Sequence, residues 1–185
     1  MSAVELGACS LDIVQLSAIP GRTQELERTV RARGAGLSAF GRALGAERQL
    51  VLCVRPSRWW WIGPPGAACA RAGEWRQACA GAGRVVDLSS ALTALHLAGP
   101  ASVDVLRRLC RLDLHPALFT PGAAAVTVMA QLSVTMVSLG TGWLLLTPAS
   151  TGRDLKESLG HAARPFGLRR SEPPLDALWS LENVA

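Results

Sequence analysis

The feature that most constrains this chain is a run without any charged side chain, from Pro116 to Gly152. A run of that length could cross a membrane, or it could be buried inside a globular protein. It contains Gln131 and the turn-like Gly140-Thr141-Gly142, and its apolar residues alternate with small or polar ones, as they do in β-strands. We therefore expect buried strands rather than a transmembrane helix, over 123–130, 132–139 and 143–146.

The stretch just before this run predicts a strand, a turn and a helix. Leucines alternate with smaller or polar residues over 92–98. Gly99-Pro100 ends that strand and starts a helix with proline in its first turn. Val103, Leu106 and Cys110 recur at helical spacing. The predicted helix extends to Arg111, and the arginines at its carboxyl end complement the helix dipole. We expect this unit, with an exit loop over 112–116, to open the second half of the fold.

The order of predicted elements is the same in both halves of the chain. In the first half the predicted order is strand, helix, two strands, helix and strand, over 9–17, 23–34, 49–54, 58–62, 67–80 and 85–88. Thr23 is the expected N-cap of the first helix, and the glycine-rich segment after it is expected to be a loop. In the second half the strand over 92–98 and its helix come first, and the three strands of the uncharged run follow. A helix over 150–163 and a strand over 166–169 complete the second half.

We therefore predict an α+β fold of duplicated ferredoxin-like halves, each with the order βαββαβ. Residues 1–170 are expected to form a single compact domain of two pseudo-repeats, at about 9–90 and 91–170. Sheets covered by helices on one side would bury the uncharged run. Residues 171–185 are expected to form a C-terminal tail that is either frayed or docked on a partner, and Trp179 favours docking.

The charge pattern argues against a nucleic-acid-binding protein. The chain of 185 residues has a net charge of +5, but its basic residues are scattered, and it contains no tyrosine. Nucleic-acid binders cluster their basic residues and interleave them with aromatic residues that stack on bases. An RNA-binding ferredoxin-like module is therefore the weakest alternative.

The cysteines indicate a cytoplasmic protein. Their number, 5, is odd and no two form a C-x-x-C pair, which argues against a disulfide framework and against a zinc site. Glu5 and Asp12 lie where a secretory signal would need a basic start and an apolar core. We expect the protein to be cytoplasmic.

No motif predicts catalysis, and we assign no catalytic, cofactor-binding or metal-binding residue. His96 lies in an apolar strand, His115 in an exit loop and His161 near the end of a helix. The expected roles are a buried, hydrogen-bonded His96 and a His115 ring that bonds backbone groups in a turn. Asp87 and Asp113 form no evident pair of carboxylates.

Three consecutive tryptophans follow a turn at Pro56-Ser57. Successive side chains of a strand point to opposite faces, so the middle indole faces one side and its two neighbours face the other. Both faces therefore need cover, from the core, from another subunit or, least favoured, from a ligand. The candidates for contact with another chain are Trp59, Trp60, Trp61, His115 and Trp179.

Several motifs together resemble one family. They are Leu95-His96-Leu97-Ala98-Gly99-Pro100, Cys110-Arg111-Leu112-Asp113-Leu114-His115-Pro116, Trp61-Ile62-Gly63-Pro64 and Trp143-Leu144-Leu145. With them the chain resembles the gamma subunit of heterotetrameric sarcosine oxidase, over roughly residues 45–167. The resemblance places the chain in the folate-binding aminomethyltransferase-like superfamily. The short N-terminus and the triple tryptophan depart from the family pattern and leave the amine substrate open.

The resemblance implies an accessory, non-catalytic gamma subunit of a complex that oxidatively demethylates sarcosine or a related N-methyl amine, as an oxidase or a dehydrogenase. It implies alpha, beta and delta subunits as partners, and no nucleic acid or membrane. FAD, FMN, NAD and tetrahydrofolate would be held mainly by those subunits, and no cofactor by this chain. The alternative is a stand-alone folate-binding aminomethyltransferase-like enzyme, for which Asp87 or Asp113 would be the poised carboxylate.

Overall fold

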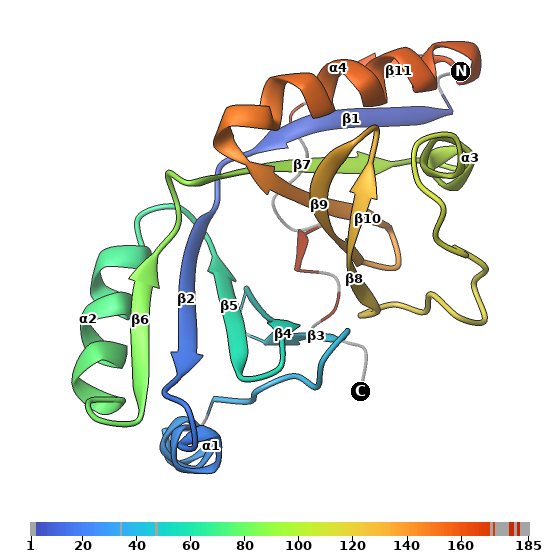
Figure 1. Cartoon of the computed structure of the whole chain (residues 1–185). Helices are drawn as coiled ribbons and strands as arrows, with labels where there is room; N and C mark the ends of the chain where they lie inside the picture. The colour runs from blue at the N-terminus through green and yellow to red at the C-terminus, as the bar shows by residue number, and fades with distance from the viewer. Residues whose placement is uncertain are drawn as a thin grey trace.

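The computed structural model describes residues 3–33, 35–46, 48–170, 172, 178, 179 and 181. Two β-sheets organise these residues (Figure 1). The five-stranded sheet contains, in spatial order, β3 (Ala43–Ala46), β4 (Gln49–Arg55), β5 (Arg58–Gly63), β2 (Asp12–Ala18) and β6 (Gly83–Asp87). The six-stranded sheet contains β11 (Leu168–Arg170), β1 (Val4–Cys9), β7 (Leu92–Ala98), β10 (Gly142–Pro148), β9 (Leu132–Ser138) and β8 (Ala124–Met129).

Helices cover the outer face of each sheet. The five-stranded sheet carries α1 (Thr23–Ala32) and α2 (Ala68–Ala78), and the six-stranded sheet carries α3 (Ser102–Arg107) and α4 (Gly152–Ala163). Short 3₁₀ turns, η1 (Ala149–Thr151) and η2 (Arg164–Phe166), flank α4. The inner faces of the sheets meet each other, so the layers run helix, sheet, sheet, helix (Figure 1).

A shared hydrophobic core lies between the two sheets. Side chains from both sheets form one buried cluster, which includes Ile13, Leu50, Leu52, Ile62, Val137, Leu144 and Leu146. A second cluster lies between the six-stranded sheet and its helices, and two smaller ones lie under α1 and α2. The central strands are therefore covered on both faces, and burial of their apolar side chains stabilises the fold by about 25 cal/mol per Å².

The uncharged run forms β8, β9 and β10, within two residues of the predicted bounds. Trp143 and Leu145 of β10 face α3 and α4, while Leu144 and Leu146 face the other sheet. A strand buried on both faces has no need of charged residues. In the part of the chain that the structure describes, no helix is long and apolar enough to cross a membrane.

The two halves share most of one pairing scheme, but β6 pairs with β2 in the first half, whereas β1 lies between β11 and β7 in the second. The first strand of each half pairs antiparallel with the strand before its last helix, β2 with β5 and β7 with β10. Each half also adds one edge strand, β3 beside β4 and β8 beside β9. The predicted α+β fold of duplicated ferredoxin-like halves is confirmed.

The strand predicted over 9–17 is present as β2, which begins at Asp12, but β1, a separate strand that ends at Cys9, was not predicted. β1 pairs antiparallel with β7 and parallel with β11, whereas β2 lies in the five-stranded sheet. In β1, Val4 and Leu6 face the helices and alternate with Glu5 and Gly7, a short strand pattern that the prediction missed. The Glu5 carboxylate lies 3.4 Å from the Arg169 guanidinium on β11.

Predictions for two other segments are also corrected. β3 lies within the glycine-rich segment expected to be a loop, because pairing with β4 supplies order that its own sequence lacks. The helix after Gly99-Pro100 ends at Arg107 rather than Arg111. There the backbone N–H of Leu109 donates to the Leu106 carbonyl at 2.9 Å and closes the helix with a tight turn.

The start of α1 also differs from the prediction. Thr23 is the first helical residue, Arg22 occupies the N-cap position, and no side chain caps the helix. The Thr23 hydroxyl lies 2.8 Å from the Ser57 hydroxyl in the turn between β4 and β5, so a tertiary hydrogen bond takes the place of the expected cap. The predicted end at Gly34 lies outside the described residues.

Candidate functional site

The three consecutive tryptophans of β5 alternate between the two faces of the sheet, as the sequence predicts. Trp59 and Trp61 are 4% and 7% exposed and face the helices, while Trp60 is half-buried against the core between the sheets. Each indole N–H donates to the protein: Trp59 to the Ser38 carbonyl, Trp60 to Gln15 Oε1, and Trp61 to Gln49 Oε1. Trp59 and Trp61 thus pack mainly within this chain.

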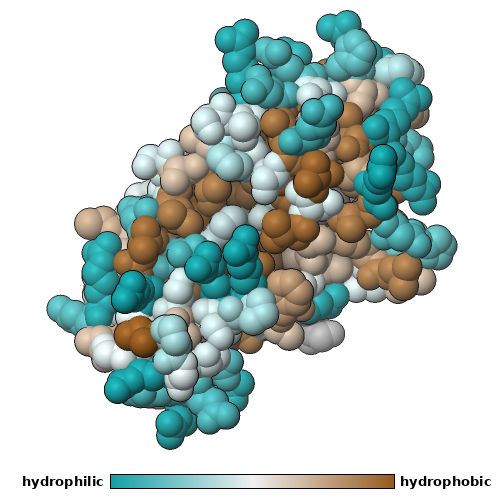
Figure 2. All heavy atoms as spheres, in the orientation of Figure 1, coloured by the Kyte–Doolittle hydropathy of each residue, from teal (hydrophilic) through white to brown (hydrophobic). Residues whose placement is uncertain are grey.

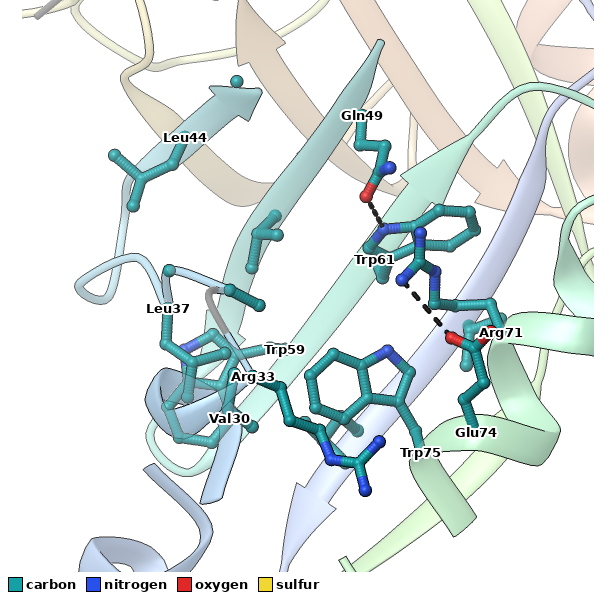
Figure 3. A pocket seen from close by; sticks show the side chains of 16 residues that line it. Val30, Arg33, Leu37, Leu44, Gln49, Trp59, Trp61, Arg71, Glu74 and Trp75 are labelled. Atoms are coloured by element: carbon teal, nitrogen blue, oxygen red, sulfur yellow. Dashed lines mark hydrogen bonds and ion pairs between the residues drawn. The ribbon is translucent and has the colours of Figure 1, made fainter. Parts of the chain in front are cut away.

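A hollow of about 480 Å³ opens above Trp59 and Trp61, on the helix side of the five-stranded sheet (Figure 3). Its floor consists of side chains from β2, β4 and β5, and its walls come from the end of α1, the following loop, β3 and α2. The residues that line it are Val14, Leu16, Val30, Arg33, Ala35, Gly36, Leu37, Leu44, Gly45, Gln49, Val51, Trp59, Trp61, Arg71, Glu74 and Trp75.

Charged side chains from α2 stand at one side of this hollow (Figure 3). The Arg71 guanidinium lies 5.0 Å from the centre of the Trp61 ring, within the range of a cation–π contact. The same guanidinium lies 3.5 Å from the Glu74 carboxylate, which is largely exposed. The positively charged Arg71 side chain therefore lies where the apolar floor of the hollow meets solvent.

The sequence did not point to this hollow. Trp75 was recognisable as part of the apolar stripe of its helix, and Trp61 as a strand residue that needs cover. Nothing in the sequence spacing brings Gln49, Arg71 and Trp75 to one place. The pairing of β4 with β5 and the packing of α2 on the sheet do so.

Asp87 and Asp113, the carboxylates considered for the enzyme alternative, accept hydrogen bonds within turns. Asp87 Oδ1 accepts hydrogen bonds from the backbone N–H and hydroxyl of Ser89, and these bonds lower the pKa of Asp87. Asp113 Oδ1 accepts from the His115 N–H at 2.9 Å, and His115 Nδ1 accepts from the Ala117 N–H at 3.2 Å. The turn predicted for His115 is present, and neither carboxylate lines the hollow.

His96 is 5% exposed on β7, on the strand face turned toward the other sheet. Its Nε2 atom has no hydrogen-bond partner among the described residues, so the expected hydrogen bond is missing at that atom. Burial lowers the pKa of His96, and the Glu5 carboxylate opposes this shift. The neutral imidazole is thus the form that the fold favours.

This burial predicts a pH-dependent stability. Because the pKa of His96 is lower in the folded than in the unfolded state, the unfolded chain binds the proton more readily, and stability falls as the pH drops below about 6.5. The slope from one such group cannot exceed about 1.4 kcal/mol per pH unit. In urea unfolding at about pH 7.5 and about pH 5.5, we expect His96→Leu to lose less stability than the wild-type protein. Equal losses would contradict a buried neutral His96.

Three cysteines, Cys9, Cys53 and Cys79, are structural. Burial raises the pKa of Cys9 to about 12, and it also raises the pKa of Cys53 and of Cys79. Thiols with a raised pKa are poor nucleophiles and poor metal ligands. Within the described ranges, no three His, Cys, Asp or Glu side chains gather into a metal site.

Trp179 packs within this chain. It is 4% exposed and joins Leu178 and Leu181 in the core between the sheets. Its Nε1 atom has no hydrogen-bond partner in the described part of the chain. This burial leaves little of the indole for a partner to contact, whereas His115 is exposed.

Comparison with known proteins extends the resemblance seen in the motifs. No protein-family model matches the chain. A sarcosine oxidase subunit gamma from Arthrobacter sp. is 36% identical over 137 residues, which are 72% of this chain and 66% of that relative. A sarcosine oxidase subunit gamma from Corynebacterium sp. strain P-1 is 34% identical over 152 residues, 74% of this chain and 73% of that relative.

Solved structures agree with these relatives. A chain of the heterotetrameric sarcosine oxidase from Corynebacterium sp. U-96 superposes with a TM-score of 0.79 at 28% identity, covering 91% of this chain and 87% of that one. The glycine cleavage system aminomethyltransferase T from Bartonella henselae shares the fold, with a TM-score of 0.68 at 17% identity over 91% of this chain and 48% of that one. The chain therefore belongs to the sarcosine oxidase gamma-subunit family.

Proposed function

We propose that the chain is an accessory, non-catalytic gamma subunit of a heterotetrameric complex that oxidatively demethylates sarcosine or a related N-methyl amine. The observation that carries this proposal is the similarity to gamma subunits over most of the chain. The engagement of Asp87 and Asp113 in turns supports a non-catalytic role, since neither is free to act as a base in a pocket.

The proposed partners are the alpha, beta and delta subunits of that complex. The proposed cofactors of the complex are FAD, FMN, NAD and tetrahydrofolate, held mainly by those subunits. The likeness of this fold to a chain of a heterotetrameric enzyme supports the partners.

Exposed apolar side chains support packing against a larger subunit. Apolar atoms reach the surface at several places on the face drawn in Figure 2. Phe40 is 64% exposed, and Val126 and Val128 of the edge strand β8 are 50% and 63% exposed. Phe40 and Val126 line one shallow hollow of about 170 Å³. The start of β8 is covered, because the Ala124 N–H donates to the Gly41 carbonyl, but the rest of β8 is the last strand of its sheet. Apolar sheet edges tend to associate, so we propose this edge as the face that meets the large subunit.

The proposal is tested by purifying the tagged chain gently and identifying what accompanies it. We expect three companion chains and the yellow colour of bound flavin. Purified alone, the chain is expected to show no oxidation of sarcosine and no stoichiometric flavin. A colourless monomer from the native cell, or oxidation by the isolated chain, would refute the assignment.

The docking face is tested separately. The double variant Phe40→Asp/Val126→Asp places charges on exposed positions, so we expect the chain to stay folded and to recover at least tenfold less of the companion chains, since desolvating each charge costs several kcal/mol. The matched control is Val86→Asp, whose side chain is 44% exposed on β6, at an edge of the other sheet. Equal recovery of the companion chains with both variants would show that the interface lies elsewhere on the chain, and the assignment of function would stand.

For domain organisation, we propose that residues 1–170 act as one compact domain of pseudo-repeats at about 9–90 and 91–170. The matching strand pairings of the two sheets support the repeats. The placement of β1 in the sheet of the second repeat supports a single domain. Of the C-terminal tail proposed for residues 171–185, Leu178, Trp179 and Leu181 are buried in the core of this chain.

A further inference from the structure

The hollow above Trp59 and Trp61 has no part in the accessory role proposed above, and its chemistry points to a ligand. We propose that it is a binding site for a planar aromatic anion, such as a fused-ring carboxylate. The inference rests on the shape of the hollow, on the side chains that line it and on the balance of hydrogen-bond donors and acceptors at its rim.

The size and lining of the hollow fit a flat ring system. Its volume of about 480 Å³ lies in the range of ligand pockets, about 300–1,000 Å³. Three indoles line it, Trp59 and Trp61 from the floor and Trp75 from α2 (Figure 3). The N–H groups of Trp59 and Trp61 already donate to Ser38 and Gln49, and the Arg71 guanidinium lies over the Trp61 ring, so the part of these indoles that reaches the hollow is ring carbon. Such surfaces stack on aromatic rings.

The polar side chains at the rim are mostly donors. Arg33 and Arg71 can only donate, and Glu74 is the single carboxylate among the lining residues, so the lining carries one net positive charge. Gln49 Oε1 accepts a hydrogen bond from the Trp61 N–H, so the Gln49 side chain can offer a ligand its NH₂ group as a donor. A carboxylate or sulfonate on a ligand would accept hydrogen bonds from these donors, whereas a cationic ligand would be repelled by the two arginines.

The position of Arg71 makes it the main anion-binding group. The Arg71 side chain is 32% exposed and its guanidinium lies over the Trp61 ring. Its positive charge therefore lies at the opening of the hollow, beside the apolar floor. A ligand that stacks on the floor would place an acidic substituent next to this guanidinium. The ion pair with the exposed Glu74 is weak, because exposed pairs are screened by water, and an incoming anion can replace it.

Calorimetric titration of the full-length chain with 2-naphthoate, a flat aromatic anion, tests the proposal. We expect saturable one-to-one binding. The neutral 2-naphthylmethanol and the non-aromatic cyclohexanecarboxylate are each expected to bind roughly tenfold more weakly, because each lacks one of the two recognised features. This readout does not depend on the oxidase complex, so its failure and the failure of the proposed function are distinguishable.

Two variants locate the site. Arg71→Gln should weaken 2-naphthoate binding roughly tenfold, while Arg76→Gln, an exposed position on the same helix outside the hollow, should leave it unchanged. Gln49→Glu keeps an acceptor for the Trp61 N–H but replaces the amide donor by a carboxylate. It should weaken 2-naphthoate roughly tenfold and 2-naphthylmethanol hardly at all. Absence of 2-naphthoate binding, equal affinities for the three compounds, or equal effects of Arg71→Gln and Arg76→Gln would overturn the proposal.

Discussion

Replacing Gly99 by alanine is expected to lower the free energy of unfolding by about 3 kcal/mol or more. Gly99 joins β7 to α3 with φ +101°, a region that residues with a Cβ rarely adopt. A Cβ at this position would also lie 2.5 Å from the Ala3 carbonyl oxygen, which is backbone and cannot rotate away. That oxygen accepts a hydrogen bond from the Ala101 N–H at 3.1 Å, so its displacement would loosen the N-terminal strand as well.

Gly21→Ala is the matched control for this variant. Gly21 also has a positive φ, +81°, but a Cβ there would meet nothing within 4 Å. It should therefore cost only the backbone strain, about 1 kcal/mol. Urea unfolding followed by circular dichroism gives both values, and the difference between them measures the steric part. Similar losses for both variants would show that the Ala3 backbone yields to the added methyl group.

Trp59→Ala is expected to cost about 3–5 kcal/mol, the usual loss when a buried large aromatic side chain is truncated. Trp59 is 4% exposed and packs with Leu16, Leu26 and Val30 under α1. Its removal would leave a cavity and would also leave the Ser38 carbonyl without its donor, the Trp59 N–H at 3.0 Å.

Trp60→Ala provides the comparison within the same strand. Its indole is half-buried on the opposite face of the sheet, so truncation should cost about 1–2 kcal/mol. The same unfolding experiment ranks the two variants. A larger loss for Trp60→Ala would mean that the face toward the second sheet, rather than the face toward the helices, depends most on this strand.

The strands of the uncharged run could be predicted closely because each one repeats a local signal. Alternation over Val126 to Met129 and the turn at Gly140-Thr141-Gly142 are properties of neighbouring residues, and β8, β9 and β10 follow them. The faces of the triple tryptophan were predictable for the same reason, since side-chain direction alternates in any strand.

β1 and β3 could not be predicted because their order comes from distant partners. The partners of β1 lie about ninety and more than one hundred and sixty residues away, as in the pairs of Leu6 with Leu97 and Val4 with Leu168. The hollow was hidden for a related reason. Gln49, Arg71 and Trp75 meet only when β4 and α2 are placed on the same sheet.

The position of β1 has a consequence for the order in which the protein is made. β1 is synthesised before the other described strands, but it lies between β7 and β11, which follow it by about ninety and more than one hundred and sixty residues. The five-stranded sheet can pair its strands as soon as β6 has emerged, since all of its members precede residue 88. In the six-stranded sheet, β1 stays unpaired until β7 has been made, and the sheet is complete only after β11 has emerged.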